Sequence, residues 1–533
     1  MAYLLHQLLE RTAAATPEKE ALRFEGRGWT YGEVERRANQ AAHALVRAGA
    51  QCGDRVGIYM RKGFEACIAM CGALKAGCAY VPLDPWLPAE RVEFLLRDCG
   101  IRALFADSSR LGRLAETVAD STPLEVVLGP TAGEAALPSV VTIGWEEISS
   151  LPESAPEVAL TELDLAYIFY TSGSTGEPKG MMHTHRSGLS FVEWTLGQFR
   201  VRPEDRIGNH APLHFDLSLF DYFTAAAAGA TTVIVSEERQ KMPASVAQLI
   251  ADERLSIWYS VPAAWTQMLL RGGLRQRDLS SLRLVIFGGE PFPVHLLRDL
   301  MAILPEAEFC HVYGVTETNV CTFWPVPRPL PAVEALPIGK LCPNMEGVVL
   351  DEDGGLAAPG EAGELAIRGP GVMEGYWNQP GLDSAAFWTR TGAGQRVERF
   401  YRTGDLVEPD AAGDLRFLGR RDRQVKSRGH RIELDEVQAA LAAQPSVAEA
   451  AVYAVPDGEG SRQVEAAVVV RDGARWDESA VLRGVRERTA AYAAPARIRL
   501  MANLPRTSAG KVDFQRLVRE ASEEPALTTE RAV

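Results

Sequence analysis

An eleven-residue stretch rich in glycine and hydroxyl side chains has the composition of a phosphate-binding loop. It reads Tyr170-Thr-Ser-Gly-Ser-Thr-Gly-Glu-Pro-Lys-Gly180 and follows the apolar run 165–170, which we predict to be a buried strand. Glycine lets backbone N–H groups approach a ligand, hydroxyls add donors, and lysine adds positive charge. The spacing does not fit the G-x-x-x-x-G-K-[ST] P-loop, and the alternative is a flexible Ser/Gly turn. The candidate phosphate contacts are Thr171, Ser172, Gly173, Ser174, Thr175, Gly176 and Lys179.

The elements around this loop alternate between strand-like and helical patterns. Strands are expected at 55–60, 79–83 and 282–287, and helices at 64–75 and 295–304. This alternation predicts an α/β fold with mainly parallel sheets covered by helices. Ligands bind beyond the carboxyl ends of strands in such sheets, and both the glycine-rich loop and the Gly288-Gly289 turn have that position.

The pattern changes after about residue 420. Strands are expected at 447–455 and 464–471 and helices at 436–443 and 478–492, which indicates a small α+β unit. We therefore predict an N-terminal domain at 1–421 and a C-terminal domain at 422–533. The basic stretch 419–428 at their junction is either an interdomain hinge or a solvated charged face. The charged tail after Gln515 is expected to fray.

Composition narrows the class of protein. The 56 Lys and Arg residues against 70 Asp and Glu residues give a net charge of −14, which argues against nucleic-acid and anionic-membrane partners. The apolar run 222–235 is too short to span a bilayer, and residues 1–10 resemble an amphipathic helix more than a signal peptide. The eight cysteines show no metal-ligand spacing, and we expect Cys67 and Cys71 to fill core. A reduced, cytoplasmic protein is expected.

Several ordered motifs resemble those of the adenylate-forming superfamily, which contains acyl-CoA synthetases, luciferases and the adenylation domains of nonribosomal peptide synthetases. The motifs extend from Thr30-Tyr31-Gly32-Glu33 to Lys511. The resemblance implies a large N-terminal domain, a small mobile C-terminal domain, and attack of a carboxylate on the α-phosphate of ATP. The products would be an acyl-adenylate and pyrophosphate, and the cofactors would be ATP and Mg²⁺.

The same resemblance assigns roles to nucleotide-binding residues. In Tyr313-Gly314-Val315-Thr316-Glu317 the tyrosine would stack on adenine, Thr316 would contact the α-phosphate, and Glu317 would bind Mg²⁺. Asp405 would accept hydrogen bonds from both ribose hydroxyls, and Arg420 would contact the nucleotide. The adenine pocket would be completed by Gly289, Glu290 and Pro291.

The C-terminal motifs imply a hinge and a catalytic lysine. Lys511 would place an ammonium between the substrate carboxylate and the α-phosphate. Asp422 would be the pivot between an adenylating and a thioester-forming orientation, and Gly429 would lie beside the pantetheine thiol in the second orientation.

The motif His214-Phe215-Asp216-Leu217-Ser218 resembles that of the amino-acid-activating subgroup. An aspartate in an apolar pocket would repel a fatty acyl chain, whereas an α-ammonium would pair with it. By resemblance the pocket wall comprises Leu217, Phe220, Ser260, Ile286, Gly288, Val312, Val320 and Cys321.

This wall favours a small-to-medium apolar amino acid, and the resemblance favours the free-standing prolyl-adenylating enzymes. Alanine, glycine, valine and a nonproteinogenic cyclic amino acid stay open, because one methylene changes selectivity by only about 1–3 kcal/mol. The expected acceptor is a separate phosphopantetheinylated carrier protein. The alternatives are an acyl- or aryl-CoA ligase and an ATP-sensing module without chemistry.

Overall fold

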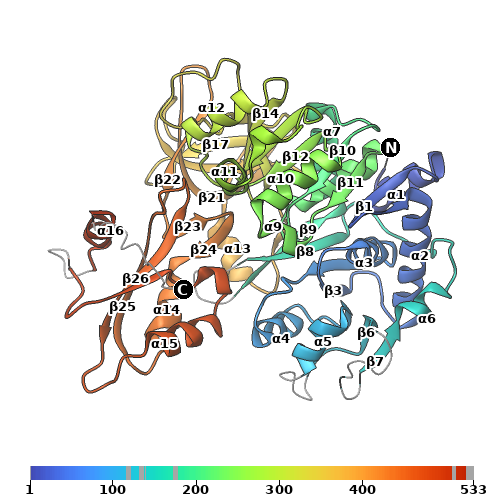
Figure 1. Ribbon diagram of the computed structural model, residues 1–533, viewed down its shortest axis with the longest axis horizontal. Coiled ribbons are helices and arrows are strands. Elements are labelled where there is room, and N and C mark those ends of the chain that lie inside the picture. Colours follow the sequence, from blue (N-terminus) through green and yellow to red (C-terminus); the bar gives the residue numbers. More distant parts are fainter. Residues whose placement is uncertain are drawn as a thin grey trace. The chain divides into compact units, whose positions relative to one another are not determined.

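The computed structural model describes residues 2–115, 122–130, 137, 140–171, 178–506 and 512–523. Its contacts divide the chain into two compact units. The first comprises Met1–Tyr170 and Lys179–Arg421, and the second comprises Thr171–Pro178 and Asp422–Val533. Figure 1 shows the order of the elements along the chain.

Two large sheets form the centre of the first unit. The nine-stranded sheet has the order β16-β15-β14-β13-β12-β10-β11-β1-β2. Its strands, in chain order, are β1 Glu20–Phe24, β2 Arg27–Thr30, β10 Arg206–Asn209, β11 Thr231–Ile234, β12 Ile257–Ser260, β13 Leu284–Gly288, β14 Glu308–Val315, β15 Asn319–Pro325 and β16 Lys340–Leu341. From β1 through β11, β10, β12 and β13 to β14 the pairs are parallel, as the alternation predicts.

The eight-stranded sheet has the order β19-β9-β8-β4-β3-β5-β6-β7. Its strands are β3 Arg55–Tyr59, β4 Ala79–Pro82, β5 Ala103–Ala106, β6 Val126–Gly129, β7 Val141–Gly144, β8 Leu165–Thr171, β9 Lys179–Thr184 and β19 Gly375–Tyr376. The pairs from β8 through β4, β3, β5 and β6 to β7 are parallel. The mixed α/β class with parallel sheets is therefore confirmed.

Helices cover both sheets and fill the space between them. One apolar cluster joins side chains of both sheets with those of α2, α3 and α7 and is the core between the sheets. A second cluster packs α10, α11 and α12 on the outer face of the nine-stranded sheet, and a third packs α4 and α5 on the outer face of the eight-stranded sheet. The result is five alternating layers, because each sheet buries both of its apolar faces. The helices of this unit are α1 His6–Ala15, α2 Tyr31–Arg47, α3 Phe64–Lys75, α4 Ala89–Asp98, α5 Ser108–Ala115, α6 Trp145–Ser149, α7 His185–Phe199, α8 Ala225–Ala228, α9 Glu237–Gln240, α10 Pro243–Asp252, α11 Pro262–Arg271, α12 Val294–Ile303 and α13 Pro380–Ala386, with a π-helix η1 Phe220–Thr224 and 3₁₀ turns η2 Leu274–Gln276 and η3 Ala393–Gln395.

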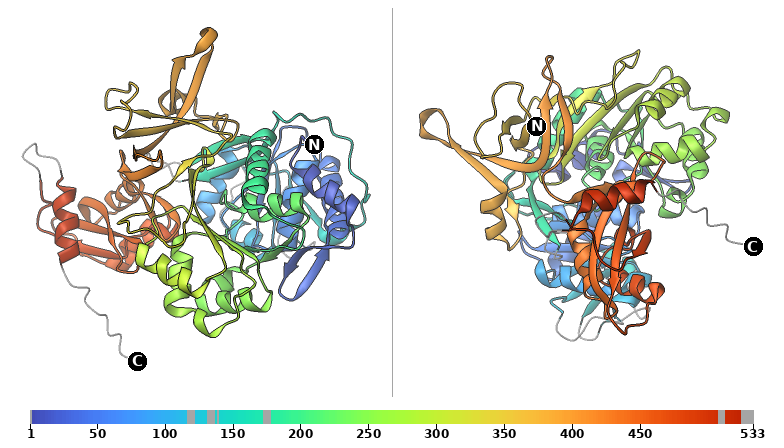
Figure 2. Two further views of the ribbon diagram at one scale, coloured as in Figure 1. Left: turned by 90° about the horizontal axis from the view of Figure 1, so that it is seen from above. Right: turned by 90° about the vertical axis from the view of Figure 1, so that its left-hand side faces the viewer.

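A third sheet of five strands completes the first unit, and Figure 2 shows its strands in tan and orange. It is antiparallel and contains β17 Glu346–Leu350, β18 Gly363–Arg368, β20 Phe387–Thr391, β21 Val397–Pro409 and β22 Leu415–Arg420. The long strand β21 carries Tyr401 and Asp405 through the middle of this sheet.

The second unit is a small α+β body. A hairpin of β23 Gln424–Ser427 and β24 His430–Glu433 precedes a three-stranded sheet of β25 Val447–Pro456, β26 Arg462–Val470 and β27 Arg497–Leu500. Its helices are α14 Leu434–Ala442, α15 Glu478–Arg486 and α16 Phe514–Glu523, with a 3₁₀ turn η4 Ala491–Ala493.

Two expectations for this unit were wrong. The helix expected at 478–492 ends at Arg486, where the chain turns before η4. Residues 516–523 do not fray, because α16 buries Leu517 and Ala521 in an apolar cluster with the β25 side chains Tyr453 and Val455. Residues 524–533, the rest of that expectation, lie outside the described residues.

The motif Thr30-Tyr31-Gly32-Glu33 has a clear structural role at the start of α2. The Thr30 side chain accepts a hydrogen bond from the Glu33 backbone, and the Glu33 side chain accepts one from the Thr30 backbone, which is a capping box. The Tyr31 hydroxyl then donates to the carbonyl of Ala230 at 2.6 Å. The motif therefore fixes the start of α2, and with it the hairpin β1–β2 that precedes this helix, to the residue before β11.

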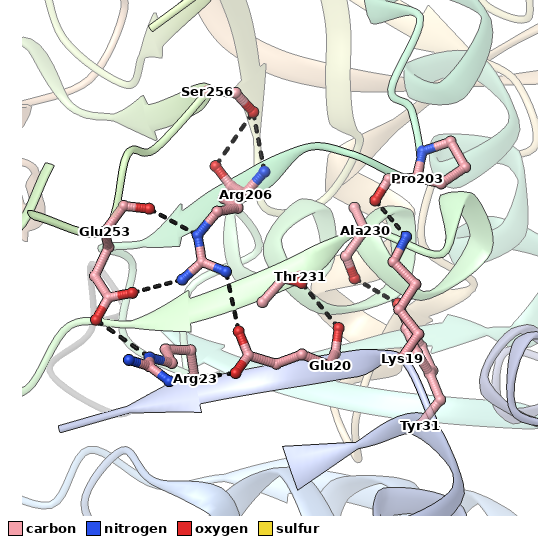
Figure 3. A network of polar contacts seen from close by, with 10 residues as sticks. All are labelled: Lys19, Glu20, Arg23, Tyr31, Pro203, Arg206, Ala230, Thr231, Glu253 and Ser256. Carbon is pink, nitrogen blue, oxygen red and sulfur yellow. Dashed lines mark hydrogen bonds and ion pairs between the residues drawn. The ribbon is translucent and has the colours of Figure 1, made fainter. Parts of the chain in front are cut away.

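A polar network strengthens the same attachment (Figure 3). Arg206 on β10 donates to Glu20 on β1 at 2.9 Å and to the carbonyl of Glu253 at 2.7 Å. Glu253 also accepts from Arg23 at 3.2 Å. The network joins segments that are about 200 residues apart in the chain.

The apolar run 222–235 divides between the π-helix, α8 and the buried strand β11. Cys67 and Cys71 are both buried on α3. Among the described residues, no helix combines the length and apolar character that crossing a membrane requires.

Candidate active site

The described part of the phosphate loop begins and ends on neighbouring strands of the eight-stranded sheet. Thr171 ends β8 and Lys179 begins β9, so both lie at the edge where ligands of such sheets bind. Ser172, Gly173, Ser174, Thr175 and Gly176 lie outside the described residues. The ammonium of Lys179 lies 5.8 Å from the ring centroid of Tyr376, which belongs to the strand paired with β9. The ring face attracts the cation and limits where it can point.

Thr316 and Glu317 occupy the tight turn between β14 and β15. The backbone N–H of Thr318 donates to the carbonyl of Val315 at 2.8 Å, which closes the turn. His183 on β9 reaches this turn, and its Nε2 lies 2.9 Å from the carbonyl oxygen of Thr316. Its Nδ1 lies 3.1 Å from the hydroxyl of Ser187. Burial lowers the pKa of His183 to about 4, so the ring is neutral, donates from Nε2 to the carbonyl and accepts from Ser187 at Nδ1.

Glu317 is fully buried, with a relative exposure of 0%. The Tyr376 hydroxyl donates to its Oε1 at 3.1 Å, and the hydroxyl of Tyr401 lies 3.1 Å from that of Tyr376. The backbone carbonyl of Glu317 accepts from Met373 at 2.8 Å. A carboxylate removed from water needs hydrogen-bond donors in place of water, and Tyr376 supplies one here.

Tyr313, Asp405 and Arg420 form a second buried group. The Tyr313 hydroxyl donates to Asp405 Oδ2, and Arg420 donates to Asp405 Oδ1 at 2.6 Å. Burial and the charge of Asp405 raise the pKa of Tyr313, so the phenol stays protonated as a donor. Each carboxylate oxygen has a further lone pair, which leaves Asp405 able to accept from a pair of hydroxyl groups.

The turn after β13 contains Gly289, Glu290 and Pro291. Gly289 has φ = +94°, a conformation that favours glycine. Glu290 is buried, and its Oε1 accepts a hydrogen bond from the backbone N–H of Ala263 at 2.8 Å. Glu290 therefore satisfies a donor in the first turn of α11 and fixes the turn against that helix.

Most of the expected acid-binding wall lies on one face of the nine-stranded sheet or packs against it. Leu217, Phe220, Ile286, Val312 and Val320 belong to or contact the cluster between the two large sheets. Gly288 pairs with Val312, and a Cβ at position 288 would lie 2.3 Å from the Val312 carbonyl oxygen, so only glycine fits.

Ser260 and Cys321 have different surroundings. Strand register pairs Tyr259 with Ile286 and Ser260 with Phe287, so Ser260 lies on the face opposite Ile286. There its hydroxyl accepts from the Trp258 indole at 2.9 Å. Cys321 belongs to a separate cluster with Tyr313, and its Sγ lies 3.6 Å from the Tyr313 carbonyl oxygen.

Asp216 lies in the segment that connects β10 to the π-helix η1. Its backbone carbonyl accepts from Leu219 at 3.0 Å, which holds it in a turn. Burial and then the charge of Asp216 raise the pKa of Tyr259, and the same carboxylate contributes to the raised pKa of Tyr167. The charge of Asp216 therefore acts on one tyrosine from each of the two large sheets.

In the second unit, Asp422 and Gly429 lie at the two ends of β23. Asp422 accepts a hydrogen bond from the Gln424 backbone at 3.2 Å. Arg428 and Gly429 have φ = +50° and +83° and connect the paired residues Ser427 and His430, which is a two-residue hairpin turn of type I′. The turn itself thus requires a residue such as glycine at 429. Lys511 lies outside the described residues.

Sequence reasoning missed Tyr376, His183 and Tyr259, none of which belongs to a motif with recognisable spacing. Tyr401 opens the motif Tyr401-Arg402-Thr403-Gly404-Asp405, in which only Asp405 was assigned a role. The Gly-Tyr pair at 375–376 would have been a usable signal only if the antiparallel pairing of β19 with β9 had been known.

Comparison with known proteins identifies the family of this chain. The AMP-binding enzyme family model matches residues 9–377, and the AMP-binding enzyme C-terminal domain model matches residues 436–511. An L-proline--[L-prolyl-carrier protein] ligase from Pseudomonas fluorescens is 35% identical over 97% of this chain and 99% of its own length. A ligase of the same description from Streptomyces coelicolor is 35% identical over 93% of each chain.

Solved structures show the same fold. The crystal structure of IdnL1 matches with a TM-score of 0.78 and 30% identity, covering 95% of this chain and 99% of that one. The chain therefore belongs to the AMP-binding enzyme family, the ATP-using, AMP-forming ligases of the adenylate-forming superfamily.

Proposed function

We propose that this protein activates a small-to-medium apolar amino acid, with proline favoured, and passes it to a separate phosphopantetheinylated carrier protein. The amino acid carboxylate attacks the α-phosphate of ATP, giving an aminoacyl-AMP and releasing pyrophosphate. The carrier thiol then attacks the acyl carbon, forming a thioester and releasing AMP. The relatives described as prolyl-carrier protein ligases support this assignment over nearly the whole chain.

The observation that carries the proposal is the place of Asp216. It is a partly buried carboxylate whose neighbours Leu217 and Phe220 belong to or pack against the apolar cluster. A fatty or aryl acid would bring only apolar groups against this carboxylate, which is costly. The α-ammonium of an amino acid removes that cost, and the apolar residues accept an apolar side chain. Ser260 is the weakest member of this proposed wall, because its hydroxyl turns to the other face of the sheet.

The remaining contacts follow from the two buried groups. Lys179, with the loop from Thr171, would hold the β- and γ-phosphates, and Thr316 would contact the α-phosphate. Asp405 and Arg420 would hold the ribose, and Tyr313 would border the adenine with Gly289, Glu290 and Pro291. Hydrogen-bond donors that are already in place at these positions would stabilise the negative charge that develops when the carboxylate displaces pyrophosphate from the α-phosphate.

Glu317 is the proposed Mg²⁺ ligand. Mg²⁺ is usually bound by one or two carboxylates together with substrate phosphates and water. Among the described residues, no three His, Cys, Asp or Glu side chains gather as a metal site, so a dedicated protein cage is not present there. A single carboxylate with its own tyrosine donor fits the arrangement in which the nucleotide supplies most ligands. The bound ion would neutralise phosphate charge.

Residues of the C-terminal domain have proposed roles in both adenylation and transfer to the carrier. We place the domain boundary at 421/422, with Asp422 as the pivot that changes the orientation of residues 422–533. Lys511 would balance negative charge during adenylation, and Gly429 would border the pantetheine thiol during transfer. Because the reaction consumes ATP, we further propose that the protein acts in the cytoplasm.

ATP–pyrophosphate exchange with a substrate panel tests the proposal. The panel holds L-proline, alanine, glycine, valine, pipecolate, a medium-chain fatty acid and an aryl acid. We expect exchange with amino acids only, strongest with proline. Exchange with the fatty or aryl acid and none with amino acids would instead support an acyl- or aryl-CoA ligase. Transfer is tested by mass spectrometry of a candidate holo-carrier protein, where free CoA as the better acceptor would contradict the carrier assignment.

A further inference from the structure

Lys62 is a buried cation at the ligand edge of the eight-stranded sheet. It lies between β3 and α3 and has a relative exposure of 6%. Its ammonium donates to the backbone carbonyls of Asn209, His210 and Ala211 at 2.8, 3.1 and 3.3 Å. Three acceptors match the three protons of an ammonium group. Lys62 therefore connects the eight-stranded sheet, where it follows β3, to the segment that leaves β10 of the nine-stranded sheet.

That segment carries Asp216. It begins where β10 ends at Asn209 and returns at the π-helix η1, which starts at Phe220. Each of these carbonyls also accepts from a second donor: the Val235 backbone reaches the Asn209 carbonyl at 3.2 Å, the Gln240 side chain reaches that of His210, and Asn209 Nδ2 reaches that of Ala211 at 3.1 Å. Lys62 is the donor that the three share, so it holds them toward one point and contributes to the direction in which the chain leaves β10.

The base of the segment is closed by side-chain hydrogen bonds. Asn209 Nδ2 donates to Asp221 Oδ2 at 2.8 Å and to the Ala211 carbonyl at 3.1 Å. The Tyr222 hydroxyl donates to Asn209 Oδ1 at 3.0 Å. Asn209, Asp221 and Tyr222 are all buried, and Asp221 and Tyr222 belong to the π-helix, an element often found at functional sites.

The interior of the segment is equally constrained. The Ser218 hydroxyl donates to the Leu213 carbonyl at 3.2 Å, and the Ser218 backbone donates to the Phe215 carbonyl at 3.0 Å. With both ends and the middle held, the position of Asp216 depends in part on where Lys62 holds the first three carbonyls. A displacement at the base would be transmitted through this chain of bonds.

Keeping Lys62 buried is unfavourable by itself. Burial lowers the pKa of Lys62 to about 7, while the charges of Glu237 and Asp221 oppose that change. A hydrophobic residue of similar size would fill the volume without this cost. Because burying an ammonium is energetically unfavourable, Lys62 is expected to do more than fill space.

We propose that Lys62 is a positioning residue that sets the place of the Asp216 carboxylate and so determines recognition of the substrate ammonium. This inference rests on the proposed function, because it assumes that Asp216 meets an amino acid. Lys62 itself does not touch the substrate in this role. It acts through the carbonyls of residues 209–211 and the turn that follows them.

The test compares Lys62→Met with a matched buried lysine. Lys75 has a side-chain exposure of 1% and bonds Glu10 and Glu35 at 2.6 and 2.7 Å, joining helices α1, α2 and α3. Lys75→Met should destabilise the protein without changing recognition. Lys62→Met should raise KM for the best amino acid by about 10- to 100-fold while KM for ATP stays within about twofold, because small displacements of a binding group are that costly. Lys62→Arg, which keeps the charge and donors, should restore part of the loss.

A substrate analogue separates positioning from general damage. Cyclopentanecarboxylate resembles proline but lacks the ammonium, so the wild-type ratio of kcat/KM for proline over this analogue reports the Asp216 contact. Lys62→Met should lower that ratio at least about tenfold, and Lys75→Met should leave it unchanged. If Lys62→Met fails to fold, Asn209→Ser must show the same selective change.

Three results would overturn the inference. The first is that Lys62→Met leaves KM for the amino acid and KM for ATP unchanged. The second is that Lys62→Met raises both KM values equally. The third is that Lys75→Met lowers the preference for proline over cyclopentanecarboxylate as much as Lys62→Met does. A wild-type protein that exchanged with no amino acid would instead refute the proposed function, and the positioning role with it. The two failures are therefore distinguishable from the wild-type data alone.

Discussion

Replacing Tyr376 by phenylalanine removes one hydroxyl from the buried carboxylate that we propose as the Mg²⁺ ligand. The ring stays, so the contact with Lys179 at 5.8 Å is retained. The hydrogen bond to Glu317 Oε1 at 3.1 Å is lost. The change thus separates the two contacts that Tyr376 makes with charged groups of opposite sign.

The expected magnitude follows from the surroundings of Glu317. A hydrogen bond to a charged group contributes about 1.5–3 kcal/mol, and Glu317 is fully buried, so water cannot replace the hydroxyl. At about 1.4 kcal/mol per factor of ten, the loss corresponds to roughly 10- to 100-fold. Removing a partner of a metal-binding side chain typically costs a similar factor in metal affinity. We therefore expect the Mg²⁺ concentration for half-maximal exchange to rise by about 10- to 100-fold.

Two measurements check this value. The Mg²⁺ dependence of pyrophosphate exchange gives the activation constant, and EPR titration of Mn²⁺ in the presence of ATP gives metal affinity without turnover. Tyr376→Leu serves as a comparison because it also removes the ring beside Lys179. It should raise KM for ATP by a further factor of about two to five even at saturating Mg²⁺, as expected for loss of a cation–π contact.

The reasoning would be refuted by an unchanged metal dependence in Tyr376→Phe. It would also fail if KM for the amino acid rose while Mn²⁺ affinity stayed constant, since the hydroxyl would then act on a different group. Tyr401→Phe, which removes only the outer hydroxyl of the pair, should have the smaller effect.

Four further changes have definite expected outcomes. Lys511→Ala should lower adenylation about 10²- to 10³-fold while ATP binding, measured calorimetrically, stays near wild type; wild-type exchange would exclude this lysine from the mechanism. Asp216→Ala should raise KM for the amino acid far more than KM for ATP, and equal increases would indicate a structural role. Arg206→Met should lower the free energy of unfolding by about 2 kcal/mol in urea titrations, whereas Arg102→Met, which breaks an exposed pair with Glu125, should lower it much less; similar losses would contradict the importance of the network. Burial lowers the pKa of His6 to about 3, so the unfolded chain alone binds this proton as pH falls from about 6.5 to 3, and stability is lost over that window. His6→Gln should therefore lose about 2 kcal/mol less than wild type between pH 7 and pH 5, and identical pH dependence would show that the histidine is already charged.

The sequence alone determined the class of fold and which residues are able to take part in chemistry. Alternating apolar runs identified the parallel strands because the period of hydrophobicity reports which faces are buried. The helix α3 begins and ends where the pattern predicted. Glycine-rich and carboxylate motifs predict the nucleotide site because few residue types can perform those roles.

The tertiary structure alone decided how these residues are held. Glu317 meets Tyr376 across 59 residues, Thr316 meets His183 across 133, and Lys62 meets Asn209 across 147. The face on which Ser260 lies was likewise fixed by its bond to Trp258 and by the register of β12 with β13. Local sequence records the preference of each residue for a strand, a helix or a buried position. It does not record which distant donor will satisfy a buried carbonyl or carboxylate, because that choice depends on how separate strands align in the folded chain.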